Sequence, residues 1–395
     1  MIDQKKVVRD EELEERIDNV KLSPKTDLYE SDICNAELVM DAHCTDPFKF
    51  MRIQKYDVAP MAKEPDDVVI RVEATTVCDE DCRIRDGTFP WKLGQKPSFP
   101  MCPGLDCVGI VTSAGELAAR YGIDLGDRVA ALSLNGCTSK YIQLKFDEIV
   151  KVPDNADPKE AVAVIRVYTA AFQALMMNLK GSNRYARKPM QGDKVLIVGP
   201  CSAFEKALVE LSFYLGAKRV YYCCISSNNK SHDTYIRMLG AKPLSSDPEE
   251  WMEELEGKID VAIDSMCVDR YECSYSSLKE DGILIATGMR DLLKSSDFVS
   301  TVEKAWVKTY IAMDSKCASY DGVIETFQDD KKQFMKDLIF LYNILEKGKI
   351  KPKISTVVSM KKVAAAQERL DLQPESLERK GIIVVEPWLL DVEDE

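Results

Sequence analysis

Between residues 192 and 288 the chain alternates short apolar runs with segments whose apolar residues recur at helical spacing. The first unit, GDKVLIVGPCSAFEKALVELSFYLGAKRVYYCC, predicts a buried strand, a tight loop, a helix and a second buried strand. VAIDSM and GILIATG predict two further strands. Strands that alternate with helices are typical of a parallel sheet with crossover helices. We therefore expect an α/β fold with a doubly wound parallel sheet here.

The segment from residue 36 to about residue 151 has a different pattern, with short apolar runs separated by glycine and proline. These runs predict strands at Val68–Val72, Cys107–Val111 and Arg128–Leu132. GDRVAA and GDKVLIV share one form, a Gly-Asp turn followed by a buried strand. A partly closed β domain fits this segment.

Helical spacing begins near Pro158 and runs to about Leu179, and a strong helix is predicted at Lys331–Lys347 with Gly348 at its C-cap. Near the C-terminus, KISTVVS and GIIVVEP return to strand character. The tail is therefore expected to rejoin a sheet.

Composition limits the classes of function. At 395 residues the chain is expected to form two domains, and 45% hydrophobic with 30% charged residues is typical of a soluble globular protein. The net charge of −13 argues against broad binding to nucleic acid or to anionic membranes. The apolar runs are too short to span a bilayer. A small anionic ligand is not excluded, because it responds to local charge.

Residues 1–33 form a charged extension with no apolar secretory core, and it is too acidic for a transit peptide. Within it, Asp10–Leu22 has the spacing of an amphipathic helix. Such a helix either lies on its own domain or docks a protein partner. The 13 cysteines are scattered along the chain, so we expect reduced thiols and a cytoplasmic protein. An organellar location, reached after removal of a leader, is the alternative.

The order of the motifs resembles that of the medium-chain dehydrogenase/reductase family. The landmarks are ATTVCDEDCRIRDG, PGLDCVGIV, GDRV, YTAAFQAL, GDKVLIVG, LGAKRV, DVAIDSM, GILIATG and GKIKPKIS. The resemblance implies a GroES-like β domain, here residues 34–160 with 345–395, and a Rossmann nucleotide-binding domain at residues 161–344. It also implies a homodimer formed through the edges of the nucleotide-domain sheets, for which a strand near Trp306–Met313 is the candidate.

The catalytic zinc ligands of one branch of this family are largely missing. Cys78 matches the first ligand, whereas Leu105 stands at the histidine and Ile165 at the second cysteine. One ligand of three cannot hold zinc in a tetrahedral site, so no metal is expected. PGLDCVGIV instead resembles the PGxDxxGxV signature of the zinc-independent quinone oxidoreductase-like branch, in which NADPH passes a hydride to a quinone or an activated C=C bond.

The predicted phosphate-binding loop keeps only the first glycine of the usual G-x-G-x-x-G pattern, as Gly199. Ser202 and Ala203 stand where this branch has glycines, and both are small enough for a backbone N–H cradle. Pro200 removes one N–H donor. The resemblance places Gly199, Ser202 and Ala203 in the cofactor site, together with Thr169 of YTAAFQAL.

Glu205 replaces the last glycine and sets a carboxylate near the start of the helix. A like charge about 5–6 Å from a pyrophosphate costs about 2–3 kcal/mol at an effective dielectric constant of about 20. This corresponds to a loss of affinity of roughly 30- to 150-fold. An outward turn toward Lys206 or Lys194 would restore much of the loss. The sequence therefore predicts a weakened site.

Two further segments bear on the cofactor. After the second strand the chain lacks the acidic residue that selects NAD, and Ser227-x-x-Lys230 resembles the pair that binds the 2′-phosphate of NADP in many relatives. A solvated turn with a surface lysine is the alternative. The resemblance also places Gly288 near the nicotinamide.

The strip expected to face the nicotinamide reads CDEDCRIRDG, against N-x-x-D-x-Y-x-R-x-G in the branch. Asp81 and Arg85 match, whereas Cys78 and Arg83 replace the asparagine and the tyrosine. Arg83 can donate hydrogen bonds to a carbonyl but cannot supply a proton. Alternatively, Arg83 and Arg85 pair with the neighbouring aspartates and only hold the loop. Cys78 is either a reactive thiol or a buried, inert one.

Two functions follow as hypotheses. The first is an NADPH-dependent, zinc-independent oxidoreductase that acts on a quinone or an α,β-unsaturated carbonyl, with Arg83, Asp81, Arg85 and Cys78 as its catalytic candidates. The second is a catalytically degenerate family member that serves as a scaffold or as a subunit of a larger complex. Pro200, Glu205 and Arg83 favour the second hypothesis, as does the N-terminal extension.

Overall fold

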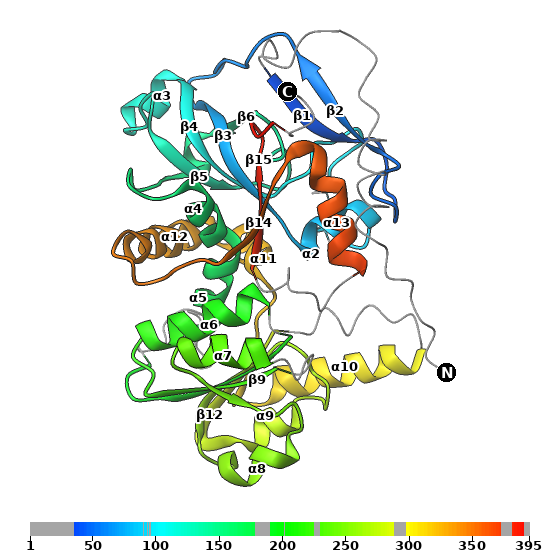
Figure 1. Ribbon diagram of the computed structural model, residues 1–395, viewed down its shortest axis with the longest axis vertical. Coiled ribbons are helices and arrows are strands. Elements are labelled where there is room, and N and C mark those ends of the chain that lie inside the picture. Colours follow the sequence, from blue (N-terminus) through cyan, green and yellow to red (C-terminus); the bar gives the residue numbers. More distant parts are fainter. Residues whose placement is uncertain are drawn as a thin grey trace. The chain divides into compact units, whose positions relative to one another are not determined.

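The computed structural model describes residues 35–89, 91–92, 94, 96–177, 190–200, 202–224, 230–287, 298–372 and 381–390. The chain divides into two compact units, which are coloured by sequence in Figure 1. One comprises residues 1–165 with 353–395, and the other residues 166–352. The N-terminal helix predicted at Asp10–Leu22 lies outside the described residues.

The first unit is built on a seven-stranded sheet with the order β14-β15-β3-β4-β5-β7, in which β6 also pairs with β3. Its strands are β3 (Asp67–Val77), β4 (Asp106–Ala114), β5 (Arg128–Leu132), β6 (Tyr141–Lys145), β7 (Ile149–Lys151), β14 (Ile354–Ser359) and β15 (Ile382–Glu386). The three strands predicted for this segment are confirmed. The tail also rejoins the sheet as expected, because β15 pairs with β3.

A separate hairpin and several short helices complete this unit. The hairpin consists of β1 (Asn35–Met40) and β2 (Met51–Tyr56). The helical segments are α2 (Asp79–Asp86), α3 (Glu116–Arg120), η2 (Phe146–Glu148), α4 (Pro158–Ala163), η5 (Met360–Lys362) and α13 (Val363–Leu372). A π-helical turn, η3 (Val164–Tyr168), continues from α4.

Strand β3 is buried along most of its length, and it pairs with three other strands, β15, β4 and β6. Gly109 on β4 allows β3 and β4 to approach closely, since a Cβ there would lie 2.2 Å from the carbonyl oxygen of Arg71 on β3. Val68, Ile70 and Val129 belong to the apolar core beneath this sheet.

The second unit contains a six-stranded sheet with the order β10-β9-β8-β11-β12-β13, and every pairing in it is parallel. Its strands are β8 (Lys194–Gly199), β9 (Arg219–Cys224), β10 (Lys242–Leu244), β11 (Ile259–Asp264), β12 (Leu278–Ala286) and β13 (Cys317–Ser319). In chain order this is the 3-2-1-4-5-6 arrangement of a doubly wound Rossmann sheet. The predicted fold class is confirmed.

Helices α6 to α11 alternate with the strands of this unit along the chain, and Figure 1 labels α6, α7, α8 and α9 among them. The helices of this unit are α5 (Thr169–Leu175), α6 (Ala203–Tyr214), α7 (Lys230–Met238), α8 (Glu249–Leu255), α9 (Glu272–Ser276), α10 (Phe298–Met313), α11 (Val323–Asp329) and α12 (Lys331–Glu346). The strong helix predicted from Lys331 is therefore confirmed, and Gly348 follows it with φ of +61°.

The strand predicted near Trp306–Met313 is wrong, because this segment belongs to the helix α10. Val307 and Ile311, four residues apart, are buried in the core, while Trp306 and Met313 are exposed, which is the burial period of a helix. The edge strand is β13, which follows α10. A homodimer remains a prediction.

Ten cysteines in the described part of the chain are free, whereas Cys224 at the end of β9 is disulfide-bonded. The expectation of reduced thiols is therefore wrong for Cys224. Among the helices that the structure describes, we find none with the length and apolar character needed to cross a bilayer.

Candidate functional site

The turn between β8 and α6 is closed by its own side chains. Ser202 is the N-cap of α6, and its hydroxyl oxygen accepts the backbone N–H of Phe204 at 3.1 Å. In return, the backbone N–H of Ser202 donates to Oε2 of Glu205 at 2.9 Å. This reciprocal pair is a capping box, for which Ser-x-x-Glu is the sequence signature. The local sequence therefore favours this conformation without any ligand.

Glu205 also reaches a second strand end. Glu205 is only 1% exposed, and its Oε2 accepts a hydrogen bond from the Ser202 hydroxyl at 2.5 Å. Oε1 accepts the hydroxyl of Ser265 at 2.7 Å. Ser265 follows β11, and its backbone N–H donates to the carbonyl oxygen of Val198 on β8. The carboxylate thus connects the ends of β8 and β11, the two strands between which the order of the sheet reverses.

That position is the topological switch point, where open α/β sheets bind their ligands. Gly199 leaves the space that the carboxylate fills, because a Cβ at Gly199 would lie 2.4 Å from Cγ and 2.6 Å from Oε1 of Glu205. The glycine of the predicted fingerprint therefore accommodates an anion that belongs to the chain itself.

An outward turn of Glu205 toward a lysine is not what the structure shows. The ammonium group of Lys206 lies 5.2 Å from the ring centroid of Tyr235. Glu205 turns inward because three donors converge on its carboxylate and satisfy the buried charge. Of the two orientations that the sequence left open for Glu205, the structure therefore has the inward one.

In this arrangement the turn does not fit the pyrophosphate of a dinucleotide. The N–H groups of Ser202 and Phe204 already donate to protein oxygens, and Pro200 has no N–H. A second anion beside the Glu205 carboxylate would meet like charge in a space that the carboxylate occupies.

The other predicted cofactor residues are dispersed or not described. Ala203 is the first residue of α6, and Thr169 is fully buried at the start of α5. Lys230 begins α7, but the position of its side chain lies outside the described part. Ser227 and Gly288 lie outside the described residues.

Asp264, the last residue of β11, is a buried carboxyl next to Ser265. It accepts the Ser274 hydroxyl at 2.6 Å and the backbone N–H groups of Met266 and Cys267 at 2.9 and 3.1 Å. Burial raises the pKa of Asp264, and these hydrogen bonds oppose the rise. Asp264 therefore holds the loop that presents the Ser265 hydroxyl to Glu205.

The strip predicted to face the nicotinamide forms α2 in the first unit. Asp81 is buried and accepts the backbone N–H of Cys78 at 2.9 Å, so it caps the helix. The thiol of Cys78 donates to Glu80 at 2.5 Å. Gly87 ends the helix with φ of +82°, and a Cβ there would lie 3.1 Å from the ring of His43.

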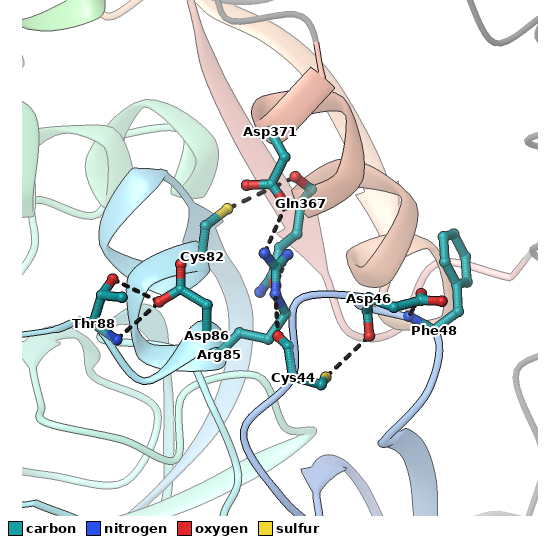
Figure 2. Close-up of polar contacts among 9 residues, drawn as sticks. All are labelled: Cys44, Asp46, Phe48, Cys82, Arg85, Asp86, Thr88, Gln367 and Asp371. Carbon is teal, nitrogen blue, oxygen red and sulfur yellow. Dashed lines mark hydrogen bonds and ion pairs between the residues drawn. The ribbon is translucent and has the colours of Figure 1, made fainter. Parts of the chain in front are cut away.

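Arg85 joins three segments of the first unit (Figure 2). Its Nη2 donates to Asp371 at 2.6 Å and its Nη1 to Gln367 at 3.2 Å, both on α13. Its Nε donates to the carbonyl oxygen of Cys44, which lies between β1 and β2. Two of its three acceptors thus come from α13, which packs against α2.

Figure 2 also shows the polar contacts that surround this arginine. Asp86 accepts the Thr88 hydroxyl and N–H, and the Cys82 thiol donates to the carbonyl oxygen of Gln367. Asp81 and Arg85 therefore make structural contacts, and their part in catalysis remains a prediction. Arg83 differs from both, because its Nε is buried without a hydrogen-bond partner in the described part of the structure.

At the positions of the missing zinc ligands, Leu105 and Ile165 are almost completely buried apolar side chains. Within the described ranges, no three His, Cys, Asp or Glu residues are grouped so that they could hold a metal ion.

The model of the alcohol dehydrogenase GroES-like domain matches residues 64–154. Human quinone oxidoreductase is 22% identical over 321 residues, which cover 80% of this chain and 88% of that protein. The pig quinone oxidoreductase is 25% identical over 333 residues, covering 81% of this chain and 91% of that protein. The crystal structure of a Pseudomonas syringae pv. Tomato DC3000 quinone oxidoreductase superposes with a TM-score of 0.65 at 19% identity, over 89% of this chain and all of that one.

The chain is thus similar to the quinone oxidoreductase-like branch of the medium-chain dehydrogenase/reductase family over most of its length. The resemblance seen in the sequence is thereby confirmed. The chain departs from the G-x-G-x-x-G fingerprint at the turn after β8, where Glu205 stands in place of the last glycine. The Ser-x-x-Glu pattern is the sequence signature of the capping box. No pattern in the sequence predicts the contact of Glu205 with Ser265, which lies 60 positions away.

Proposed function

We propose that this chain is a catalytically degenerate member of the medium-chain dehydrogenase/reductase family that acts as a scaffold or as a subunit of a larger complex. The observation that carries the proposal is the Glu205 carboxylate, which holds the switch point of the sheet through Ser202 and Ser265. A site built to bind an anion is retained, and the chain supplies that anion from its own helix.

The hydrogen bonds of Glu205 determine how much binding free energy a coenzyme would lose by displacing the carboxylate. A hydrogen bond to a charged group contributes about 1.5–3 kcal/mol net. Displacing the carboxylate gives up three such bonds, of which water replaces a part. A net loss equal to two of them, about 3–6 kcal/mol, weakens the binding of a dinucleotide roughly 10²- to 10⁴-fold.

The second candidate function is an NADPH-dependent, zinc-independent reduction of a quinone or an α,β-unsaturated carbonyl. The names of the relatives support it, and so does Arg83, whose buried Nε has no partner in the described part of the chain. A donor of this kind suits the oxygen of an acceptor on which negative charge develops. In this function Glu205 leaves the turn before the coenzyme binds, and Ser227 with Lys230 remains the candidate pair for NADP selection.

A titration that follows NADPH fluorescence distinguishes the two functions. We expect no saturable binding below about 100 μM for the wild type and micromolar binding for Glu205→Gly, a gain within the range that the lost contacts set. The matched control is Glu250→Gly, which removes an exposed first-turn glutamate from α8 and should bind as the wild type does.

Micromolar binding by the wild type, together with NADPH-dependent reduction of 1,4-benzoquinone, would contradict the first function and establish the second. Loss of that turnover in Arg83→Met, with NADPH binding retained, would assign the polarising role to Arg83.

A further inference from the structure

A basic hollow lies in the first unit, on residues that neither proposed function uses. It is open to solvent and spans about 470 Å³ with that open space included, and three lysines from separate segments line it: Lys55 on β2, Lys140 before β6 and Lys361 in η5. Trp388 and Leu389, which follow β15, complete its wall. We call this the basic hollow.

Trp388 is fixed in place at the wall of the basic hollow. Its Nε1–H donates to the carbonyl oxygen of Val72 at 2.8 Å, and Tyr141 meets its ring edge-on at 5.7 Å between centroids. The guanidinium of Arg71 lies 4.1 Å from the centre of the ring, and the ammonium of Lys140 lies 4.6 Å from it. A ring held in this way offers apolar area at little cost in conformational entropy.

The side chains that line the basic hollow include three lysines, although the protein as a whole has a formal net charge of −13. Arg71 and Lys140 lie over the ring of Trp388. Opposite charges attract mainly within a Debye length of about 8 Å at physiological salt. A ligand of the basic hollow therefore has to bring its negative charge close to these lysines.

The wall of the basic hollow is apolar as well as cationic. Leu389 is 42% exposed and Leu390 is 56% exposed, and Met360 also lines the space. Ammonium groups bind carboxylates one at a time, as point charges, so separated lysines match separated acidic groups. The apolar wall between them matches apolar side chains, as in the core and rim of a protein interface.

We propose that the basic hollow binds an acidic peptide segment of a partner protein, in which glutamate or aspartate side chains flank apolar ones. The carboxylates would pair with Lys55, Lys140 and Lys361, and an apolar side chain would pack on Trp388 and Leu389. This binding needs neither a coenzyme nor the turn at Glu205. It is therefore independent of which proposed function holds.

Fluorescence anisotropy with a defined probe tests the proposal. The probe is a fluorescein-labelled decapeptide in which glutamates flank two leucines, and the comparison peptide has glutamine in place of every glutamate. We expect saturable binding of the acidic peptide alone to the full-length chain. Lys55→Glu and Lys361→Glu should each weaken it roughly 10-fold or more, because each puts a like charge against the peptide. The control Lys63→Glu reverses an exposed lysine elsewhere in the same unit and should leave binding unchanged.

Trp388→Phe gives an independent readout, since packing of an apolar side chain on Trp388 should change its fluorescence emission on binding, and this change should disappear in the variant. Circular dichroism confirms that each variant is folded. The proposal is overturned if the acidic peptide does not bind, if the glutamine peptide binds equally well, or if Lys63→Glu weakens binding as much as Lys361→Glu. Binding of sodium polyphosphate without binding of the peptide also overturns it.

Discussion

The Glu205 carboxylate accepts the hydroxyl of Ser265 at 2.7 Å, which joins the first turn of α6 to the loop after β11. In open α/β sheets a ligand usually occupies this position, the switch point between the ends of β8 and β11. Here a glutamate at the third position of the helix fills it, while the same carboxylate caps the helix through Ser202. Closure of the switch point and helix capping are therefore one interaction, and its removal should affect both.

Ser265→Ala should lower the free energy of unfolding by about 1.5–3 kcal/mol, because it removes a hydrogen bond to a buried charge. In a Glu205→Ala background the same change should cost much less, so that a double-mutant cycle yields a coupling of about 1–2 kcal/mol. Urea denaturation measures these values. Ser133→Ala, whose hydroxyl donates to an exposed carbonyl oxygen, should change stability by less than about 0.5 kcal/mol. Equal costs of Ser265→Ala in both backgrounds would refute the contact.

Gly199→Ala should destabilise the wild type by about 1–3 kcal/mol, because the new Cβ would lie 2.4 Å from Cγ of Glu205. In Glu205→Ala the obstacle is gone, and the penalty should fall below about 1 kcal/mol. Gly122→Ala serves as the control: its φ is +81° and nothing lies near its Cβ, so backbone strain should cost the same in both backgrounds. Thermal unfolding of the variants measures the difference. A Gly199→Ala penalty that does not depend on Glu205 would contradict the prediction.

Arg85→Lys should lower the free energy of unfolding by about 3 kcal/mol. A lysine cannot reach Asp371, Gln367 and the Cys44 carbonyl together, so acceptors that include the buried Gln367 lose their donor. Arg120→Lys is the matched control, since Arg120 and Glu116 form an exposed pair one helical turn apart, and it should cost less than about 0.5 kcal/mol. Similar costs for both substitutions would mean that Arg85 does not hold α13 and the β1–β2 connection onto α2.

Asp67 should stabilise the first unit in a pH-dependent manner. Its carboxylate accepts Nζ of Lys145 and the backbone N–H groups of Lys63 and Glu64, and these bonds, led by that to Lys145, lower its pKa to about 2. Because the folded pKa lies below the unfolded value of about 3.9, this stabilisation is complete above pH 4 and is lost as the pH falls through 2. Asp67→Asn should therefore lower stability at pH 6 and have a much smaller effect near pH 2.

Urea denaturation of the wild type and of Asp67→Asn at pH 6, 4, 3 and 2 tests this. Asp281→Asn, at an exposed position on β12, should leave the wild-type curve unchanged throughout. A difference between Asp67→Asn and the wild type that stays constant from pH 6 to pH 2 would contradict the assignment.

Much of the fold was predictable from local patterns. The apolar run at Arg128–Leu132 forms β5, and the helical spacing from Lys331 forms α12, because each depends on which face of a short segment must be buried. Trp306–Met313 misled the prediction, since aromatic and β-branched residues suit a strand, while burial of Val307 and Ile311 selects a helix.

The sequence by itself determined that one segment forms a parallel sheet with crossover helices and another a β domain. It also determined that the G-x-G-x-x-G fingerprint lacks two glycines and that Ser202 and Glu205 can cap α6. All of these depend on residues a few positions apart. Only the tertiary structure decided that Glu205 meets Ser265, that Arg85 meets Asp371 and that Lys55 and Lys361 share one hollow. These partners lie far apart along the chain, and only the packing of whole strands and helices brings them together.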